Sequence, residues 1–192
     1  MIDHLRASSA SRIEPGEHIC ALVGSRTHRD AIMRPFLTEG MSAGHKCLLG
    51  LGEPNPWQTV RTLLPTLDPE HLRSAGQLDV LETHEPQFSS DDFSVPAMLE
   101  FWTDVTDEAQ AGEYEAVRLT AEARWWSPQL PQSDALIDYE AALSTFASER
   151  EVAILSVYDI EDYGWMLVDL MKTHPRVLVN EVEFANPYYA RP

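Results

Sequence analysis

Short runs of apolar residues alternate along this chain with longer segments whose apolar residues recur at helical spacing. His18–Val23 and His45–Leu51 are continuous apolar runs, the pattern of a strand buried on both faces, and each stops at a glycine. Strands that alternate with helices in this way predict a mostly parallel sheet with helices on both faces, joined by right-handed crossovers. The sequence therefore predicts a three-layer α/β/α domain.

The same pattern places the remaining elements. In the first predicted helix Thr27 is the expected N-cap, Pro35 introduces an irregularity, and Gly40 and Gly44 are expected to end it. A polar loop at 84–94 has the composition of a segment that covers a site. The other predicted strands cover 78–83, 116–122, 153–157 and 177–179, and the other predicted helices cover 57–64, 69–75, 95–112, 133–146 and 162–173.

Length and charge limit the classes of protein. The 192 residues suit one domain, which we place at 16–192 after a polar lead-in at 1–15. With 14 Lys and Arg against 31 Asp and Glu, the net charge of -17 repels phosphate backbones and anionic lipids, so we expect neither nucleic acid nor a membrane as a partner. Cys20 and Cys47 are too few for a disulfide framework, and the N-terminus lacks an apolar targeting segment. We expect a cytoplasmic protein.

The first strand ends where a nucleotide-binding domain would carry its phosphate loop. After Gly24 and Ser25 the sequence has no second glycine and no lysine followed by Ser or Thr. Arg26 and Arg29 replace those groups only in part, so we expect a degenerate phosphate loop and no ATP hydrolysis.

His18 and Cys20 lie two residues apart on the first strand, so their side chains point to the same face. Such a pair can ligate a metal or a heme iron, but the third and fourth ligands are missing. A histidine at a strand start more often bonds a backbone carbonyl. We therefore expect no metal and no other cofactor.

Polar and aromatic residues gather at the predicted strand ends. Glu122 and Asp159 form a candidate acid–base pair, although Arg118 or Arg124 can instead pair with them structurally. No serine or cysteine nucleophile stands in a recognisable motif, so we expect no catalytic residue. Because ligands bind at strand ends in open α/β sheets, we expect these carboxylates to share one pocket with nearby aromatic and amide side chains. These are Trp125, Trp126, Tyr158, Asn186, Tyr188 and Tyr189.

Six short motifs resemble, in order, those of the MEDS family, the methanogen/methylotroph DcmR-type sensory domain. They span the chain from about Pro15 to Tyr189. The resemblance implies a RecA-like fold with a decayed phosphate loop and a sensory role for small hydrocarbon derivatives. The motifs are His18-Ile-Cys20, the segment from Ala116 through Arg118 and Glu122 to Trp125, Asp138-Tyr-Glu140-Ala, Tyr158-Asp159, His174-Pro with Val177, and Asn186-Pro-Tyr-Tyr189.

The sequence departs from the family pattern in two places. Ala121 and Ala123 flank Glu122 where Gly and Met are common, and Ser156 stands where the family often has Cys. Ligand chemistry that depends on that thiol is therefore not expected in this chain.

We accordingly expect a non-catalytic sensory domain that binds a small organic ligand and signals to a separate regulator, because the resemblance uses almost the whole length. A homodimer remains open. The alternatives are an acidic protein-interaction module, of the anti-sigma or kinase-partner type with a vestigial pocket, and a residual nucleotide-binding or metal- or heme-binding protein. The expected ligand-binding residues are His18, Cys20, Gly24, Arg118, Glu122, Trp125, Tyr158, Asp159, Asn186 and Tyr188.

Overall fold

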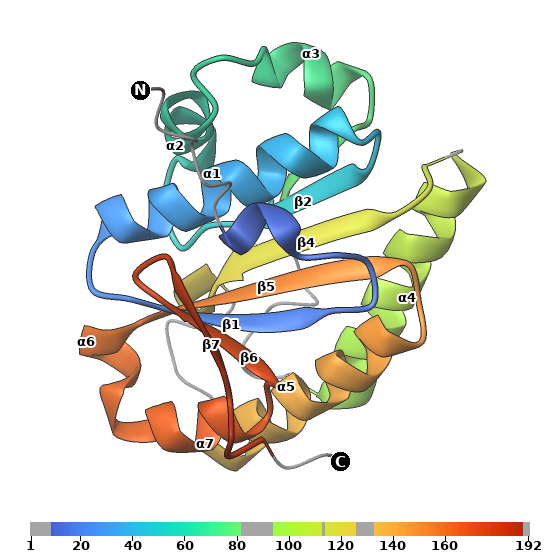
Figure 1. Ribbon diagram of the computed structural model, residues 1–192. Coiled ribbons are helices and arrows are strands. Elements are labelled where there is room, and N and C mark those ends of the chain that lie inside the picture. The colour runs from blue at the N-terminus through green and yellow to red at the C-terminus, as the bar shows by residue number, and fades with distance from the viewer. Residues whose placement is uncertain (1–8, 82–93, 113, 126–132, 190–192) are drawn as a thin grey trace, which may run out of the picture.

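A single seven-stranded sheet organises the described part of the chain. The computed structural model describes residues 9–81, 94–112, 114–125 and 133–189. The strand order is β3-β2-β4-β5-β1-β6-β7, parallel throughout except for β7, which pairs antiparallel with β6 (Figure 1). The strands are β1 His18–Val23, β2 Lys46–Gly50, β3 Leu78–Leu81, β4 Val117–Glu122, β5 Val152–Asp159, β6 Arg176–Val179 and β7 Val182–Ala185.

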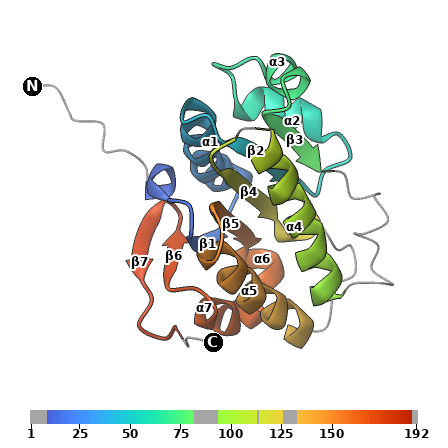
Figure 2. The ribbon, with the colours of Figure 1, turned by 90° about the vertical axis from the view of Figure 1, so that its right-hand side faces the viewer.

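Helices cover both faces of this sheet, so the predicted α/β class is confirmed. One layer holds α1, α2 and α3 and the other holds α4, α5 and α7, with the strands between them (Figure 2). The helices are α1 Arg26–Ser42, α2 Pro56–Leu63, α3 Pro69–Ser74, α4 Val95–Ala111, α5 Ser133–Ser148, α6 Ile160–Tyr163 and α7 Leu167–Lys172, with short 3-10 turns η1 Ser9–Arg12, η4 Ala123–Trp125 and η5 Gly164–Met166.

Strand alternation divides the interior into two cores. In β1 all six residues are buried, and successive side chains point to opposite faces. Cys20 and Leu22 pack toward α4, α5 and α7, while Ile19, Ala21 and Val23 pack toward α1. The continuous apolar run seen in the sequence is thus the consequence of a central strand covered on both sides.

The first helix differs from its prediction at the N-cap and at Gly40, whereas Gly44 ends it as expected. Ser25, not Thr27, is the N-cap, because its extended backbone lets the side chain accept a bond from the amide of His28. The helix continues through Gly40 to Ser42, and it ends where Gly44 adopts a left-handed conformation with φ of 76°. Gly40 therefore has a packing role instead of a terminating one.

Three other parts of the chain differ from their prediction. The expected last helix is divided into α6, η5 and α7 around Gly164. The strand β7 was missed because Val182–Ala185 is short and mostly exposed, so it lacks the signature of a buried strand. Within the expected lead-in, Ala10 and Ile13 are buried against α1. The predicted loop at 84–94 and Trp126 lie almost entirely outside the described residues.

None of the helices in the described segments combines the length and the apolar character needed to cross a bilayer.

Gly40 tests the packing of α1 on β4. A Cβ at this position would lie 2.3 Å from Cδ of Arg118, whose stem is buried over the helix. We expect Gly40→Ala to lower the free energy of unfolding by about 1–3 kcal/mol, as overpacking does. In an Arg118→Ala background the same change should cost nothing, because the clash is gone.

The matched control is Gly164→Ala, where a Cβ would meet nothing within 4 Å. Chemical denaturation of the four variants measures the effect. An equal loss for Gly40→Ala with and without Arg118 would contradict this packing.

Candidate functional site

Two separate polar sites lie on the sheet, one at its carboxyl edge and one on the face covered by α5. The first is at the carboxyl ends of β1 and β4, where Arg29 of α1 reaches across to two carboxylates. Its Nη1 lies 2.8 Å from Oε1 of Glu122 and 2.9 Å from Oε1 of Glu53. The second carboxylate oxygen of Glu122 accepts a bond from the amide of Gly52 at 3.2 Å. We call Arg29, Glu53 and Glu122 the edge site.

The charged groups of the edge site are paired with one another within the protein. Burial opposes the charge on Arg29, but Glu122 and Glu53 outweigh it and raise the pKa of this guanidinium. Burial likewise opposes ionisation of Glu53, yet the hydroxyl of Thr59 and the guanidinium of Arg29 lower its pKa. A cavity of about 50 Å³ beside these residues is also lined by Ser25 and Asp159. The edge site therefore holds its own ion pairs in a small polar hollow.

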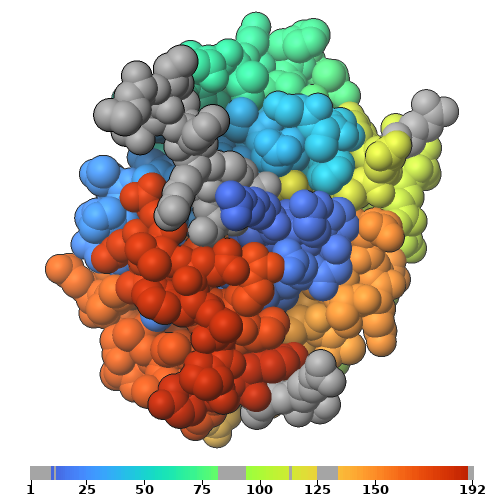
Figure 3. Space-filling model, in the orientation of Figure 1, coloured from blue at the N-terminus to red at the C-terminus, as the bar shows by residue number. Residues whose placement is uncertain are grey.

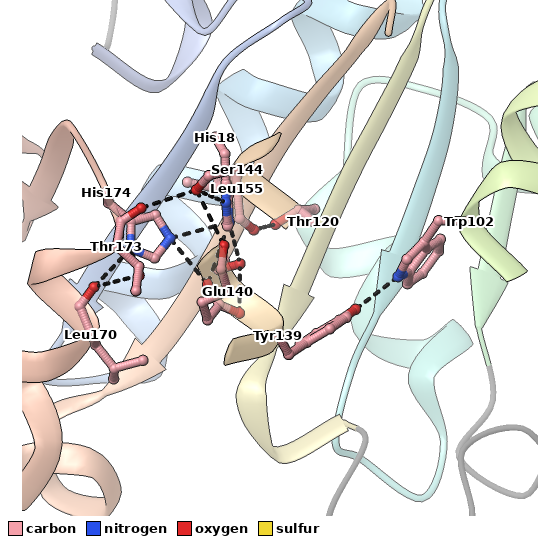
Figure 4. A network of polar contacts seen from close by, with 11 residues as sticks. His18, Trp102, Thr120, Tyr139, Glu140, Ser144, Leu155, Leu170, Thr173 and His174 are labelled. Atoms are coloured by element: carbon pink, nitrogen blue, oxygen red, sulfur yellow. Dashed lines mark hydrogen bonds and ion pairs between the residues drawn. The ribbon is translucent and has the colours of Figure 1, made fainter. Parts of the chain in front are cut away.

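The second site is a cluster beneath α5 that contains two imidazoles and one carboxylate, all buried (Figure 4). His18 begins β1, Glu140 lies on the inner face of α5, and His174 lies two residues before the start of β6. Nε2 of His174 is 3.0 Å from Oε2 of Glu140 and 3.2 Å from Nε2 of His18, and Nε2 of His18 is 3.4 Å from the same oxygen. We call these three residues the buried cluster.

Hydroxyl and carbonyl groups surround the outer nitrogens of both rings. Nδ1 of His174 lies 2.9 Å from the carbonyl oxygen of Leu170, and Nδ1 of His18 lies 2.9 Å from Oγ of Ser144. Burial, reinforced by the neighbouring His174, lowers the pKa of His18 to about 4. Burial also opposes ionisation of Glu140, but the two imidazoles hold its pKa below the usual range. His18 is therefore neutral and Glu140 ionised at neutral pH.

An aromatic cavity of about 20 Å³ adjoins the buried cluster on the same face. It is large enough for about one water molecule. Nε1 of Trp102 donates to the hydroxyl of Tyr139 at 2.7 Å across its wall. The remaining lining includes Glu140, Ser156 and Tyr158 together with aliphatic residues of β4, β5 and α5. Apolar wall and buried charge thus meet within one small volume.

The structure divides the residues that the sequence assigned to one pocket. On the α5 face it brings together His18, Cys20 and Tyr158, so the expectation that His18 and Cys20 share a face is confirmed. At the carboxyl edge, Glu122 and Asp159 line the same cavity, and the amide of Gly24 lies nearby on the same strand end.

The other predicted residues lie elsewhere. Arg118 is buried against α1, where its Nη1 donates to the carbonyl of Phe36 at 3.1 Å. Asn186 lies beside the amino end of β6 and donates to the carbonyl of His174 at 2.9 Å. Tyr188 is 72% exposed, and the side chain of Trp125 lies outside the described residues.

Two expected pairings are wrong. Glu122 pairs with Arg29 instead of Arg118 or Arg124, because the first turn of α1 points at the end of β4 while Arg124 turns to Asp162. His18 bonds the hydroxyls of Ser144 and Ser156 and not a backbone carbonyl, since α5 lies directly over the start of β1.

Sequence reasoning missed Glu140 and His174 as site residues. A signal for Glu140 was present: it interrupts the buried stripe of α5 between Leu136 and Leu143, where a charge is costly unless it is paired. His174 stands just outside a strand, and although the His174-Pro motif belongs to the family resemblance, that motif assigned the histidine no site role.

Comparison with known proteins agrees with this architecture. A family model described as MEDS, the methanogen/methylotroph, DcmR sensory domain, matches residues 17–175. A search of curated proteins found no significant match. Among solved structures, a KaiC-like protein of the hyperthermophilic archaeon Pyrococcus horikoshii OT3 superposes with a TM-score of 0.57 at 16% identity, covering 86% of this chain and 71% of that one. The RecA-like fold expected from the resemblance is confirmed.

The edge site gives a stability prediction. Removing the guanidinium with Arg29→Met leaves Glu53 and Glu122 facing each other, so we expect a loss of about 3–5 kcal/mol in the free energy of unfolding. The matched control is Arg26→Met, because the side chain of Arg26 is 76% exposed against 4% for Arg29. That control should cost less than about 1 kcal/mol. Equal losses in urea denaturation would contradict a structural role for Arg29.

Proposed function

The chain belongs to the MEDS family of sensory domains, and we propose that it senses a small organic ligand on the α5 face of its sheet and signals to a separate regulator. The observation that carries this proposal is the position of the ionised Glu140. It is 2% exposed and forms part of the wall of an otherwise aromatic and aliphatic cavity. Such a combination of apolar wall and convergent polar groups is typical of a site for a small molecule.

The cavity indicates the chemistry of the ligand. Aromatic and aliphatic side chains would contact a short hydrocarbon portion, and the hydroxyls of Ser156 and Tyr158 would contact one polar group. At about 20 Å³ the cavity is smaller than any organic ligand, so binding requires side chains of α5 to move away from the sheet. This required movement provides the two states that a sensor needs.

The edge site favours a non-catalytic role. In a RecA-like fold this edge is where a phosphate loop would lie, but here only Gly24 and Ser25 connect β1 to α1. The nearby Arg29 is committed to Glu53 and Glu122. We propose that the phosphate loop is degenerate and that the chain does not hydrolyse ATP.

A contiguous set of contacts links the cavity to the surface. Glu140 lies against His174, whose carbonyl accepts a bond from Asn186 at 2.9 Å. Asn186 directly follows β7, which is the edge strand of the sheet and exposes Val182 and Phe184. Figure 3 shows the β6–β7 hairpin, in red, on the molecular surface. We propose this hairpin as the surface that a regulator contacts, because an exposed edge strand with apolar side chains can pair with another chain.

The location of the ligand site is testable by thermal-shift screening with short-chain alcohols, ketones and halogenated hydrocarbons. We expect Ala121→Leu, which fills the cavity, to abolish the stabilisation by any compound that raises the melting temperature. Ala111→Leu on the exposed end of α4 is the matched control and should retain the response. Glu122→Gln should also retain it.

The reverse pattern, with loss in Glu122→Gln and retention in Ala121→Leu, would assign the ligand to the edge site. Stabilisation by ATP with Mg²⁺ would support nucleotide binding instead of the proposed sensor.

The signalling route is testable by hydrogen exchange with a compound identified in that screen. Binding should change amide exchange in β6 and β7, and Asn186→Ala should remove this change while binding persists, because the bond to His174 is lost. Tyr188→Ala, in the same segment but exposed, is the control. Ligand-dependent exchange of β7 that survives in Asn186→Ala would contradict the route.

A further inference from the structure

The buried cluster has the composition and spacing of a metal site. Within the described residues, His18, Glu140 and His174 form a group of three side chains whose ligand atoms converge within 4.8 Å. We propose that this cluster binds a divalent transition-metal ion through Nε2 of both histidines and the carboxylate of Glu140. The inference is independent of ligand sensing, since metal content is measured on the protein alone.

The distances agree with a common coordination sphere. The three ligand atoms are separated by 3.0, 3.2 and 3.4 Å. A tetrahedral ion with bonds of about 2.0–2.1 Å places its ligand atoms about 3.3–3.4 Å apart, and an octahedral ion places neighbouring ligands slightly closer. Two imidazoles and one carboxylate suit Zn²⁺, and they also form the ligand set of non-heme Fe²⁺ sites.

The hydrogen bonds around His174 leave its inner nitrogen free to coordinate. Oγ1 of Thr173 donates to the carbonyl of Leu170 at 2.8 Å, so toward the ring this hydroxyl can only accept. Nδ1 of His174 lies 2.9 Å from both oxygens and must carry the proton. Nδ1 is thus turned toward its outer partners and Nε2 faces the cluster, which is the orientation that outer partners give to metal-bound histidines.

The same arrangement holds for His18. Oγ of Ser144 lies 3.0 Å from the carbonyl of Thr173 and 3.2 Å from that of Glu140, and it donates to one of them. It then accepts from Nδ1 of His18, 2.9 Å away, which again leaves a lone pair on Nε2. Both inner nitrogens thus face one another and the carboxylate of Glu140.

The geometry around the carboxylate of Glu140 also suits a bound cation. Oε2 of Glu140 is buried and receives no hydrogen bond within the described residues, although it lies closest to both rings. A buried carboxylate is costly unless neighbouring groups compensate its charge. A metal ion at the centre of the cluster would supply a compensating charge and contact all three ligand atoms at once.

Ser156 identifies the open side of the proposed ion. Its Oγ lies 2.9 Å from Nε2 of His18 and 3.4 Å from Oε1 of Glu140, and it lines the aromatic cavity. Three protein ligands leave a tetrahedral ion one further position. That position faces the cavity, where water or an oxygen- or sulfur-containing molecule can occupy it.

Metal content is the test. The full chain is treated with chelator, given one equivalent of Zn²⁺ or, without oxygen, Fe²⁺, desalted, and analysed by elemental mass spectrometry. We expect one ion per chain with whichever of the two metals the site prefers. His174→Gln and Glu140→Gln should weaken binding by more than the about 10–100-fold that loss of an outer partner costs. His71→Gln, on an exposed helix end, is the matched control and should bind as the wild type does.

A spectroscopic arm covers the case in which those buried variants fail to fold. Co²⁺ bound to the wild type should give visible d–d bands without thiolate charge transfer, and Ser156→Cys should add that charge-transfer band. Failure of the wild type to retain any of the three ions would overturn the proposal, as would equal retention in the cluster variants and His71→Gln. An unchanged spectrum in Ser156→Cys would place the ion elsewhere.

Discussion

A carboxylate that is removed from water must be compensated by its neighbours, and Glu140 imposes this requirement on three separate parts of the chain. It brings the inner face of α5 over the first residue of β1 and against the turn that leads into β6. Its partners, His18 and His174, are 156 residues apart in the sequence. The pairing of β6 beside β1 and the position of the C-terminal hairpin are thus tied to one buried charge.

The two polar sites differ in their position on the sheet and in the groups that they contain. At the carboxyl edge, where such folds bind phosphates, Arg29 and two glutamates satisfy one another. The cavity lies instead between the sheet and α5, next to the buried cluster. The ion-paired edge and the charged interior support our proposal that this RecA-like domain recognises a ligand and does not hydrolyse ATP.

The sequence predicted elements whose burial produces a regular pattern of apolar residues. It did not predict which side chains distant in the sequence pair with one another. The run His18–Val23 predicted a central strand because both its faces are covered, whereas β7 was missed because it is an exposed edge. Glu122 was correctly placed at a strand end, but the rule that ligands bind at strand ends could not show that Arg29 already pairs with it. The buried cluster joins the amino ends of β1 and β6, and no local pattern predicts such a meeting.

We propose that recognition takes place on the α5 face, beside the buried cluster. The most direct measurement is a crystal structure of the protein bound to the compound that stabilises it most. We expect ligand density between Tyr139 and Tyr158, with side chains of α5 moved away from the sheet and the polar group of the ligand toward Ser156. Density beside Arg29 and Glu122 at the carboxyl edge, with α5 unmoved, would contradict it.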